Sequence, residues 1–368
     1  MKAAAHQLRA CALALVTALV AVAIPAGPVW ADSVRDRQWQ LGFLRAAEAH
    51  RYSQGAGIVV AVVDTGVDGT HPDLVGNVLS GTDVQPGATG DGRTDTDGHG
   101  TAMAGLIAAH GHGPDNSSGT LGIAPQASIL PVRDGSRKAA AGTTDGVSWA
   151  ASHGARVISI SQGSDVNDPR LQRAVAEAIA RDIVVVAAAG NIPGVSVDYP
   201  AAYPGVVAVG GVDQHGNHAE IAISGPEVML SAPAVDVVHP ALGHGYGSGT
   251  GTSDATAIVA GAAALVRARY PNLSATEVVH RLTATAIDRG PPGRDAQYGY
   301  GIVNLVGALT ADVPPLASLS ASPAGTAPTP SATPAAGKAL SPWLIVGVGL
   351  GLAIVAALGL LLAPNRRR

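Results

Sequence analysis

Residues 57–66 read Gly57-Ile58-Val59-Val60-Ala61-Val62-Val63-Asp64-Thr65-Gly66. The run is apolar and β-branched without polar alternation, which is typical of a strand buried on both faces of a parallel sheet. It ends at Asp64, before a Thr-Gly turn. In open parallel sheets, functional groups gather at the carboxyl ends of the strands. The stretch therefore predicts a buried parallel strand that delivers a carboxylate to a functional edge.

Four further runs of the same kind occupy residues 128–132, 156–160, 183–188 and 206–209. Helical patterns lie between them, at residues 142–153 and 169–181. Strands that alternate with helices in this way predict an α/β fold. We expect a doubly wound, mostly parallel sheet with helices on both faces.

The amino-terminal end predicts export. Lys2 and Arg9 precede an apolar run at residues 10–24, and a small residue, Ala31, closes the segment. These features are typical of a secretory signal peptide at residues 1–31. The one cysteine, Cys11, lies inside this segment, so we expect the mature protein to contain no disulfide.

The carboxyl end predicts a membrane anchor. Residues 343–362 carry no charge, and Arg366, Arg367 and Arg368 follow them. An apolar run of this length matches the bilayer, and the arginines should stay in the cytoplasm. We expect a transmembrane helix at 343–362, a cytoplasmic basic tail at 363–368 and a Pro/Ala/Ser/Thr-rich linker at 311–342. The alternative for 343–362 is a buried core helix.

Between these ends we expect an N-terminal arm at residues 32–55 that wraps one folded domain at residues 56–310. The anchor would hold this domain on the extracytoplasmic side of the cell membrane. The formal net charge is −4 and only 14% of the residues are charged. A body of that sign lacks the basic surface that nucleic-acid binding needs, so we expect no nucleic-acid partner.

A glycine-rich loop delivers Ser253 to the start of a helix. Residues 249–255 read Gly-Thr-Gly-Thr-Ser-Asp-Ala, and an apolar run continues to Val266. The unpaired N–H groups at a helix N-terminus favour negative charge, which suits a serine that attacks a carbonyl. The simpler interpretation is an N-cap.

Two other polar residues occupy similar positions. His99 lies in Asp97-Gly98-His99-Gly100-Thr101, before a helical run at residues 102–109, and Asn191 follows the strand run that ends at 188. Taken singly, they read as a solvated histidine and a turn residue. With Asp64 and Ser253 they supply what acyl transfer needs: a nucleophile, a base, a carboxylate to hold the base and an oxyanion donor.

These motifs resemble those of the subtilisin-like serine proteases (subtilases), which carry them in the same chain order. The matching stretches are Val62–Asp68 with His71-Pro72-Asp73-Leu74, then 97–101, then Gly251-Thr252-Ser253 with Val259-Ala260-Gly261. The similarity extends from about Trp39 to Leu309. It implies a serine endopeptidase in which Ser253 is the nucleophile, His99 the base, Asp64 its partner and Asn191 an oxyanion donor.

The resemblance also implies a site for a protein or peptide substrate. The segment Ser159-Ile160-Ser161-Gln162-Gly163 resembles the strand that pairs with an extended peptide. Ala188, Ala189 and Gly190 are small, which suggests a roomy primary pocket.

The family implies no cofactor, although some subtilases bind calcium. Asp91, Asp95 and Asp97 are the candidate ligands in this chain. Their spacing does not fit an EF-hand loop, and a solvated acidic turn is the simpler interpretation.

Within the subtilases, the layout is similar to that of the mycosins, the membrane-anchored proteases associated with type VII secretion. The signal, the arm around Gln38-Trp39, the proline-rich spacer and the C-terminal span carry this likeness. It implies association with a type VII secretion membrane complex. Two functions stay open: an endopeptidase that processes secretion substrates, and a structural subunit of that complex with proteolysis secondary. An ester hydrolase has little support, because Ser253 lacks a Gly-x-Ser-x-Gly elbow.

The chain departs from the subtilase pattern at two positions after Ser253. Ala257 stands where a proline is usual, and we expect the helix to form without it, because alanine favours helices. Asp254 suits a helix N-terminus. If its side chain instead points toward the cleft, its charge should slow peptide hydrolysis.

Overall fold

The structure, a computed structural model, describes residues 33–135, 140–192 and 195–316. The predicted signal peptide, most of the linker, the predicted anchor and the basic tail lie outside these residues. Within them, no helix is both long enough and apolar enough to cross a membrane.

A parallel sheet of seven strands forms the centre of the fold, in the order β2-β5-β1-β6-β7-β8-β9. Its strands are β1 (Val59–Asp64), β2 (Thr82–Asp83), β5 (Ser128–Arg133), β6 (Val157–Ile160), β7 (Val184–Ala188), β8 (Val207–Val212) and β9 (Val228–Pro233). The five predicted runs are all strands of this sheet. The apolar pattern does not predict β2 and β9, the two edge strands, because an edge strand needs neither a long apolar run nor freedom from proline.

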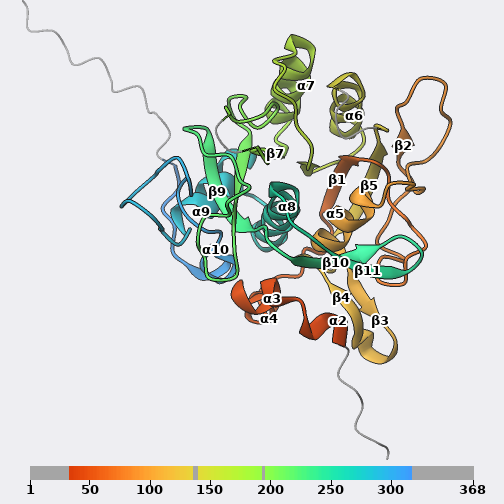
Figure 1. Cartoon of the computed structure of the whole chain (residues 1–368), viewed down its shortest axis with the longest axis horizontal. Helices are drawn as coiled ribbons and strands as arrows, with labels where there is room; N and C mark the ends of the chain where they lie inside the picture. Colours follow the sequence, from red (N-terminus) through yellow and green to blue (C-terminus); the bar gives the residue numbers. More distant parts are fainter. Residues whose placement is uncertain (1–32, 136–139, 193–194, 317–368) are drawn as a thin grey trace, which may run out of the picture. The chain divides into compact units, whose positions relative to one another are not determined.

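Helices cover both faces of the sheet, as the α/β pattern predicts. Residues of β1 alternate between the two faces: Val60 and Val62 pack with one cluster of buried residues, and Ala61 and Val63 with the other. The first cluster contains α5 (His99–Ala108) and α8 (Thr252–Arg269), and the second contains α6 (Ala140–Ser152) and α7 (Pro169–Ala180). In Figure 1, α6 and α7 lie above the sheet and α5 and α8 below it.

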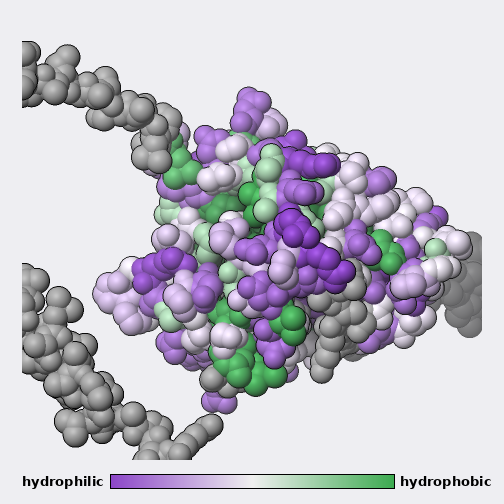
Figure 2. Space-filling model, turned by 90° about the horizontal axis from the view of Figure 1, so that it is seen from above, coloured by the Kyte–Doolittle hydropathy of each residue, from purple (hydrophilic) through white to green (hydrophobic). Residues whose placement is uncertain are grey.

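The two layers of helices differ in composition because they differ in burial. Nearly every residue of α8 is buried, and from Ala257 to Val266 this helix is apolar all round, as is typical of an interior helix. In α7 only Leu171, Ala174, Val175 and Ala178 are buried, which is one stripe at helical spacing. The outer side of this layer faces solvent, and the surface seen from above is mainly hydrophilic (Figure 2).

The first described residues form three short helices, α2 (Ser33–Asp36), α3 (Trp39–Phe43) and α4 (Ala46–Ala49). Side chains of this arm bind backbone groups far along the chain. The Arg35 guanidinium donates to the carbonyls of Asn116, Ser118 and Gly119, and the Gln40 amide donates to the carbonyl of Val238. The arm thus lies against the domain, at the lower edge of Figure 1.

The remaining elements are β3 (His110–His112), η1 (Pro114–Asn116), β4 (Ser118–Leu121), β10 (Val237–Ala241), β11 (Gly245–Gly249), α9 (Ala275–Ala284) and α10 (Leu305–Thr310). The pairs β3–β4 and β10–β11 are antiparallel.

The topology brings separate sequence motifs to one edge. The chain lays β5 on one side of β1 and β6 on the other, so the strand order reverses between β1 and β6. In open α/β sheets such a switch point leaves a crevice at the carboxyl ends of the strands. Asp64 ends β1, Ser161 follows β6 and Asn191 follows β7, so three neighbouring strands deliver polar residues to this crevice.

Candidate active site

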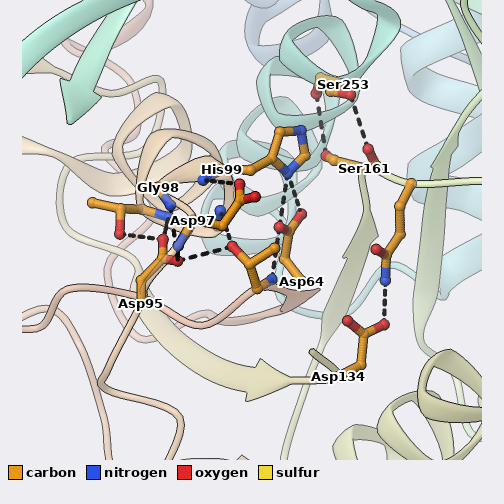
Figure 3. A network of polar contacts seen from close by, with 12 residues as sticks. Asp64, Asp95, Asp97, Gly98, His99, Asp134, Ser161 and Ser253 are labelled. Carbon is orange, nitrogen blue, oxygen red and sulfur yellow. Dashed lines mark hydrogen bonds and ion pairs between the residues drawn. The ribbon is translucent and has the colours of Figure 1, made fainter. Parts of the chain in front are cut away.

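Asp64 and His99 form a close pair at the carboxyl end of β1. His99 Nδ1 lies 2.7 Å from Oδ1 and 2.9 Å from Oδ2 of Asp64, whose side chain is fully buried. A carboxylate can only accept here, so Nδ1 carries the hydrogen and neutral His99 has its lone pair on Nε2. Figure 3 shows the imidazole between Asp64 and Ser253.

Asp64 and His99 can pair because the start of α5 lies close to the end of β1. His99 is the first residue of α5, so this helix begins three residues before the predicted run at 102–109. A Cβ on the next residue, Gly100, would overlap the carbonyl oxygen of Gly66 and lie 3.2 Å from Cβ of Asp64. Only glycine lets the start of α5 approach the end of β1 so closely.

Asp95 holds the loop that carries His99. Its Oδ1 accepts from the N–H groups of Asp97 and Gly98, at 2.9 Å each, and its Oδ2 accepts from the N–H and hydroxyl of Thr101. Thr65, next to Asp64, donates its hydroxyl to Asp95 Oδ1 at 3.0 Å. One buried carboxylate therefore ties the His99 loop to the end of β1 (Figure 3).

The three candidate calcium ligands do not gather around one point. Both oxygens of Asp95 accept hydrogen bonds from the His99 loop and Thr101. Asp91 pairs with Arg93 at 2.7 Å, and Asp97 accepts from the N–H of His99 at 3.3 Å. Among the described residues, no group of three or more His, Cys, Asp or Glu side chains could hold a metal ion.

Ser253 is the second residue of α8, at the helix start that the sequence predicts. Its hydroxyl donates to the carbonyl of Ser161 at 2.9 Å, and the Ser161 hydroxyl donates to the carbonyl of Ser253 at 3.2 Å. These two hydrogen bonds connect the segment after β6 to the start of α8. The helix runs unbroken through Ala257, so the proline that is usual there is not needed to form it.

Asn191 presents its amide to the same cleft in a fixed orientation. Its Oδ1 accepts from the N–H and the hydroxyl of Thr252, at 2.8 and 3.0 Å, which leaves the Nδ2 hydrogens for other partners. A Cβ on Gly251 would lie 3.3 Å from Asn191 Nδ2 and 3.7 Å from the Ser253 nitrogen. The missing side chain of Gly251 thus leaves room between two N–H donors, as an oxyanion hole requires.

The predicted substrate segments divide into two groups. Ser161, Gln162, Gly163, Ala188 and Gly190 line a cavity of about 250 Å³ that also contains His99, Asn191 and Ser253. Ser159, Ile160 and Ala189 do not line it. Ser159 and Ile160 are buried inside β6 and paired with β7, and Ala189 is buried with its N–H bound to Val209. Their backbone groups already pair within the sheet, and a role for these three residues in substrate binding stays a prediction.

Asp254 lines a second, larger cavity of about 610 Å³ beside His99 and Ser253. It is 3% exposed, and its Oδ1 has no hydrogen-bond partner among the described residues. Burial raises the pKa of Asp254 from 3.8 to about 7, although the nearby His99 acts in the opposite direction. A Cβ on Gly249 would lie 2.8 Å from Asp254 Oδ2 and 3.1 Å from His239 Nε2, so these two side chains converge next to the loop.

Replacing Asp254 by Asn tests the hypothesis that its charge slows hydrolysis. The carboxyl is neutral below pH 7 and ionised above it, where a negative charge beside the oxyanion opposes the reaction. We expect Asp254→Asn to raise kcat/KM about threefold to tenfold at pH 8.5, with little change at pH 5.5. The measurement is kcat/KM of both proteins on one peptide as a function of pH. A ratio of the variant's kcat/KM to that of wild type that stays constant with pH contradicts the hypothesis.

The same substitution has a signed effect on stability. A raised pKa means that the stability contributed by the neutral Asp254 is complete below about pH 4 and is lost as the pH rises through about 7. The melting temperature of Asp254→Asn, measured relative to that of wild type, should therefore increase as the pH rises across this window.

The sequence does not predict the roles of two residues in this site, Asp95 and Thr252. Its pattern suggests Asp95 only as a calcium ligand, although acidic residues commonly bind backbone N–H groups two residues on. Thr252, which orients Asn191, lies in the serine motif but has no signal of its own, because its partner is remote in sequence.

Comparisons with known proteins agree with this geometry. Residues 55–301 match the profile of the subtilase family. The chain is 40% identical to subtilisin BL from Lederbergia lenta over 273 residues, which covers 72% of this chain and 96% of that protein.

Solved structures give a second set of neighbours. A MycP3 protease described as from the type VII (ESX-3) secretion system superposes with a TM-score of 0.65 at 34% identity, over 76% of this chain and 91% of that one. MycP1 from Mycobacterium smegmatis superposes with a TM-score of 0.66 at 29% identity, over 77% and 87%. Mycosins are among its neighbours of known structure, and the chain belongs to the subtilase family of serine endopeptidases.

Proposed function

We propose that this endopeptidase cleaves peptide bonds with Asp64, His99 and Ser253 as its catalytic triad and Asn191 as an oxyanion donor. The observation that carries the proposal is the paired contact of His99 Nδ1 with both oxygens of Asp64, in the cleft that Ser253 also lines. This pairing sets the tautomer in which Nε2 can accept a proton.

The reaction begins with the Ser253 hydroxyl. A hydroxyl has one hydrogen, which Ser253 directs to the Ser161 carbonyl, so the hydroxyl must turn toward His99 Nε2 before it is deprotonated. Oγ then attacks the peptide carbonyl, and the buried Asp64 stabilises the imidazolium that forms. His99 passes the proton to the leaving amine, and a water molecule hydrolyses the acyl-enzyme by the same steps.

The negative charge of the tetrahedral intermediate falls on the former carbonyl oxygen. Asn191 Nδ2 and the Ser253 N–H are the donors proposed for it, on either side of the space next to Gly251. Both are held before substrate arrives, by Thr252 and by the helix start, so little reorganisation is needed during the reaction.

The proposal extends to the location of the enzyme. The signal-like segment at 1–31 and the uncharged run at 343–362 with its arginines support a single-pass membrane protein with an extracytoplasmic domain. Similarity to MycP3, a protease described as from the type VII (ESX-3) secretion system, supports an association with such a system. The role we propose there is to process secretion substrates. The second candidate is a structural subunit of that secretion complex, with proteolysis secondary.

One experiment tests nucleophile and location together. Intact cells that produce the full chain are treated with a membrane-impermeant fluorophosphonate probe and then fractionated. We expect one covalent adduct, at Ser253, in the membrane fraction. A chain that ends at Leu316 should carry the same adduct outside the membrane fraction. An adduct at another serine contradicts the triad, and a full-length chain that is soluble contradicts the anchor.

A further inference from the structure

The cavity of about 250 Å³ beside Ser253 has one acidic side chain that the proposed mechanism does not use. The described residues around it are small, apolar or neutral, except for His99 and Asp198. A cavity of this size is below the range for a drug-sized ligand and suits one amino-acid side chain. The chemistry of Asp198 therefore decides which side chain fits.

Two glycines make room for the Asp198 carboxylate. A Cβ on Gly190 would lie 2.7 Å from its Oδ2, and a Cβ on Gly163 would lie 3.2 Å from the same atom. These glycines belong to the two walls of the cavity, after β7 and after β6. The carboxylate thus occupies the space between the walls, where larger residues would exclude it.

The backbone fixes Asp198 in this place. Its N–H donates to the carbonyl of Ala189 at 3.0 Å, and its neighbour Tyr199 exchanges two hydrogen bonds with Ser164. One bond ties the segment to the wall after β7, and the others tie it to the wall after β6. The backbone of Asp198 is therefore held by hydrogen bonds to both walls, which fixes where its carboxylate lies.

Asp198 lacks a counterion in the described part of the chain. It is half-buried, and its side chain makes no hydrogen bond or ion pair with any described residue. Burial raises the pKa of Asp198, and the neighbouring Asp165 raises it further, so no nearby cation offsets these effects. A half-buried carboxylate without a partner is unfavourable, and a cationic guest would relieve that cost.

We propose that Asp198 makes this cavity a recognition pocket for a lysine or arginine side chain on the acyl side of the scissile bond. The inference rests on the proposed function and names its substrate class. The alkyl stem would pass Ala188 and Ile192, which line the cavity, while the cationic end pairs with the carboxylate.

The acyl side follows from where the leaving amine must lie. Asn191 and Ser253 line both cavities, so the carbonyl under attack lies where the two cavities meet. His99 passes its proton to the leaving amine, so the leaving residue lies toward the His99 loop and α5, whose Asp97, Gly98 and Met103 line only the larger cavity. The side chain nearest that carbonyl carbon belongs to the residue that supplies the carbonyl. The leaving residue has the larger cavity, with Asp254 and His239, available on the other side of His99.

Paired peptides that differ only in charge test the proposal. Purified full chain in detergent is given substrates with lysine or norleucine on the acyl side, because norleucine keeps the stem and lacks the cation. We expect kcat/KM for lysine to exceed that for norleucine roughly 10- to 100-fold. Asp198→Asn should lower this ratio to near one, and Asp198→Lys should favour a glutamate peptide instead.

Asp165→Asn is the matched control, because Asp165 is an exposed neighbouring carboxylate that does not line the cavity. It should leave the lysine-to-norleucine ratio within about threefold of wild type. A wild-type ratio near one, or a ratio that Asp198→Asn does not change, overturns the proposal. Failure to hydrolyse any peptide together with no adduct at Ser253 instead overturns the proposed function.

A small cation gives a test that does not depend on the folding of a variant. Benzamidine should inhibit hydrolysis of the norleucine peptide competitively, and neutral benzamide should not inhibit at the same concentration. Equal inhibition by both compounds overturns the proposal.

Discussion

Ser253→Ala is expected to lower kcat for peptide hydrolysis about 10⁶-fold, because it removes the hydroxyl that is proposed to form the acyl-enzyme. The measurement is the steady-state rate on one peptide, with enzyme concentration high enough to detect the residual rate. Since the hydroxyl makes one bond, to Ser161, the variant should fold and its KM should change little.

Ser148→Ala is the matched control. Ser148 lies on the exposed side of α6, and its hydroxyl also donates to one backbone carbonyl, that of Thr144, at 3.0 Å. Its removal should leave kcat within about twofold of wild type. A Ser253→Ala protein within tenfold of wild type would show that another residue is the nucleophile.

The same variant separates the two proposed roles in cells. If type VII secretion persists while cleavage of its substrates stops, the protein supports secretion as a structural subunit and proteolysis is a separate activity. If secretion and cleavage both stop although the variant accumulates normally in the membrane, secretion needs proteolysis. Secretion that also persists in cells without the protein contradicts both roles.

Asp64→Asn is expected to lower kcat about 10⁴-fold at neutral pH. The amide can present its NH₂ group to His99 Nδ1, which then holds the lone pair and leaves the hydrogen on Nε2. That tautomer cannot accept the proton of Ser253. The measurement is the pH dependence of kcat, in which the loss should hold across the neutral range, with adduct formation at Ser253 equally slowed.

The chain offers a matched control for this substitution in Asp73. It is also fully buried, and it accepts from His112 Nδ1 at 2.6 Å and from the N–H and hydroxyl of Thr120. Asp73→Asn should therefore lower the free energy of unfolding by roughly 1–3 kcal/mol without a comparable loss in the kcat of folded protein. Equal losses of kcat in Asp64→Asn and Asp73→Asn would mean that Asp64 acts only through stability.

Much of this protein could be predicted from local patterns. The uninterrupted apolar run at residues 57–66 specified a strand buried on both faces, and its repetition between helical segments specified the parallel α/β sheet. The positions of Asp64, His99 and Ser253 at element ends were also readable, because glycine turns and helix starts leave local signals. The edge strands β2 and β9 could not be predicted, since an edge strand does not need a long apolar run and tolerates proline.

Contacts between remote segments were decided by the tertiary structure alone. Asp198 enters the cavity because Gly163 and Gly190 leave space for it, and Asp254 lines its cavity beside His239, which comes from β10. The burial of Ser159 and Ile160 likewise depends on the strands that flank β6. Sequence spacing predicts which element a residue belongs to. Which side chains meet, and how far burial shifts their pKa values, depends on how the elements pack.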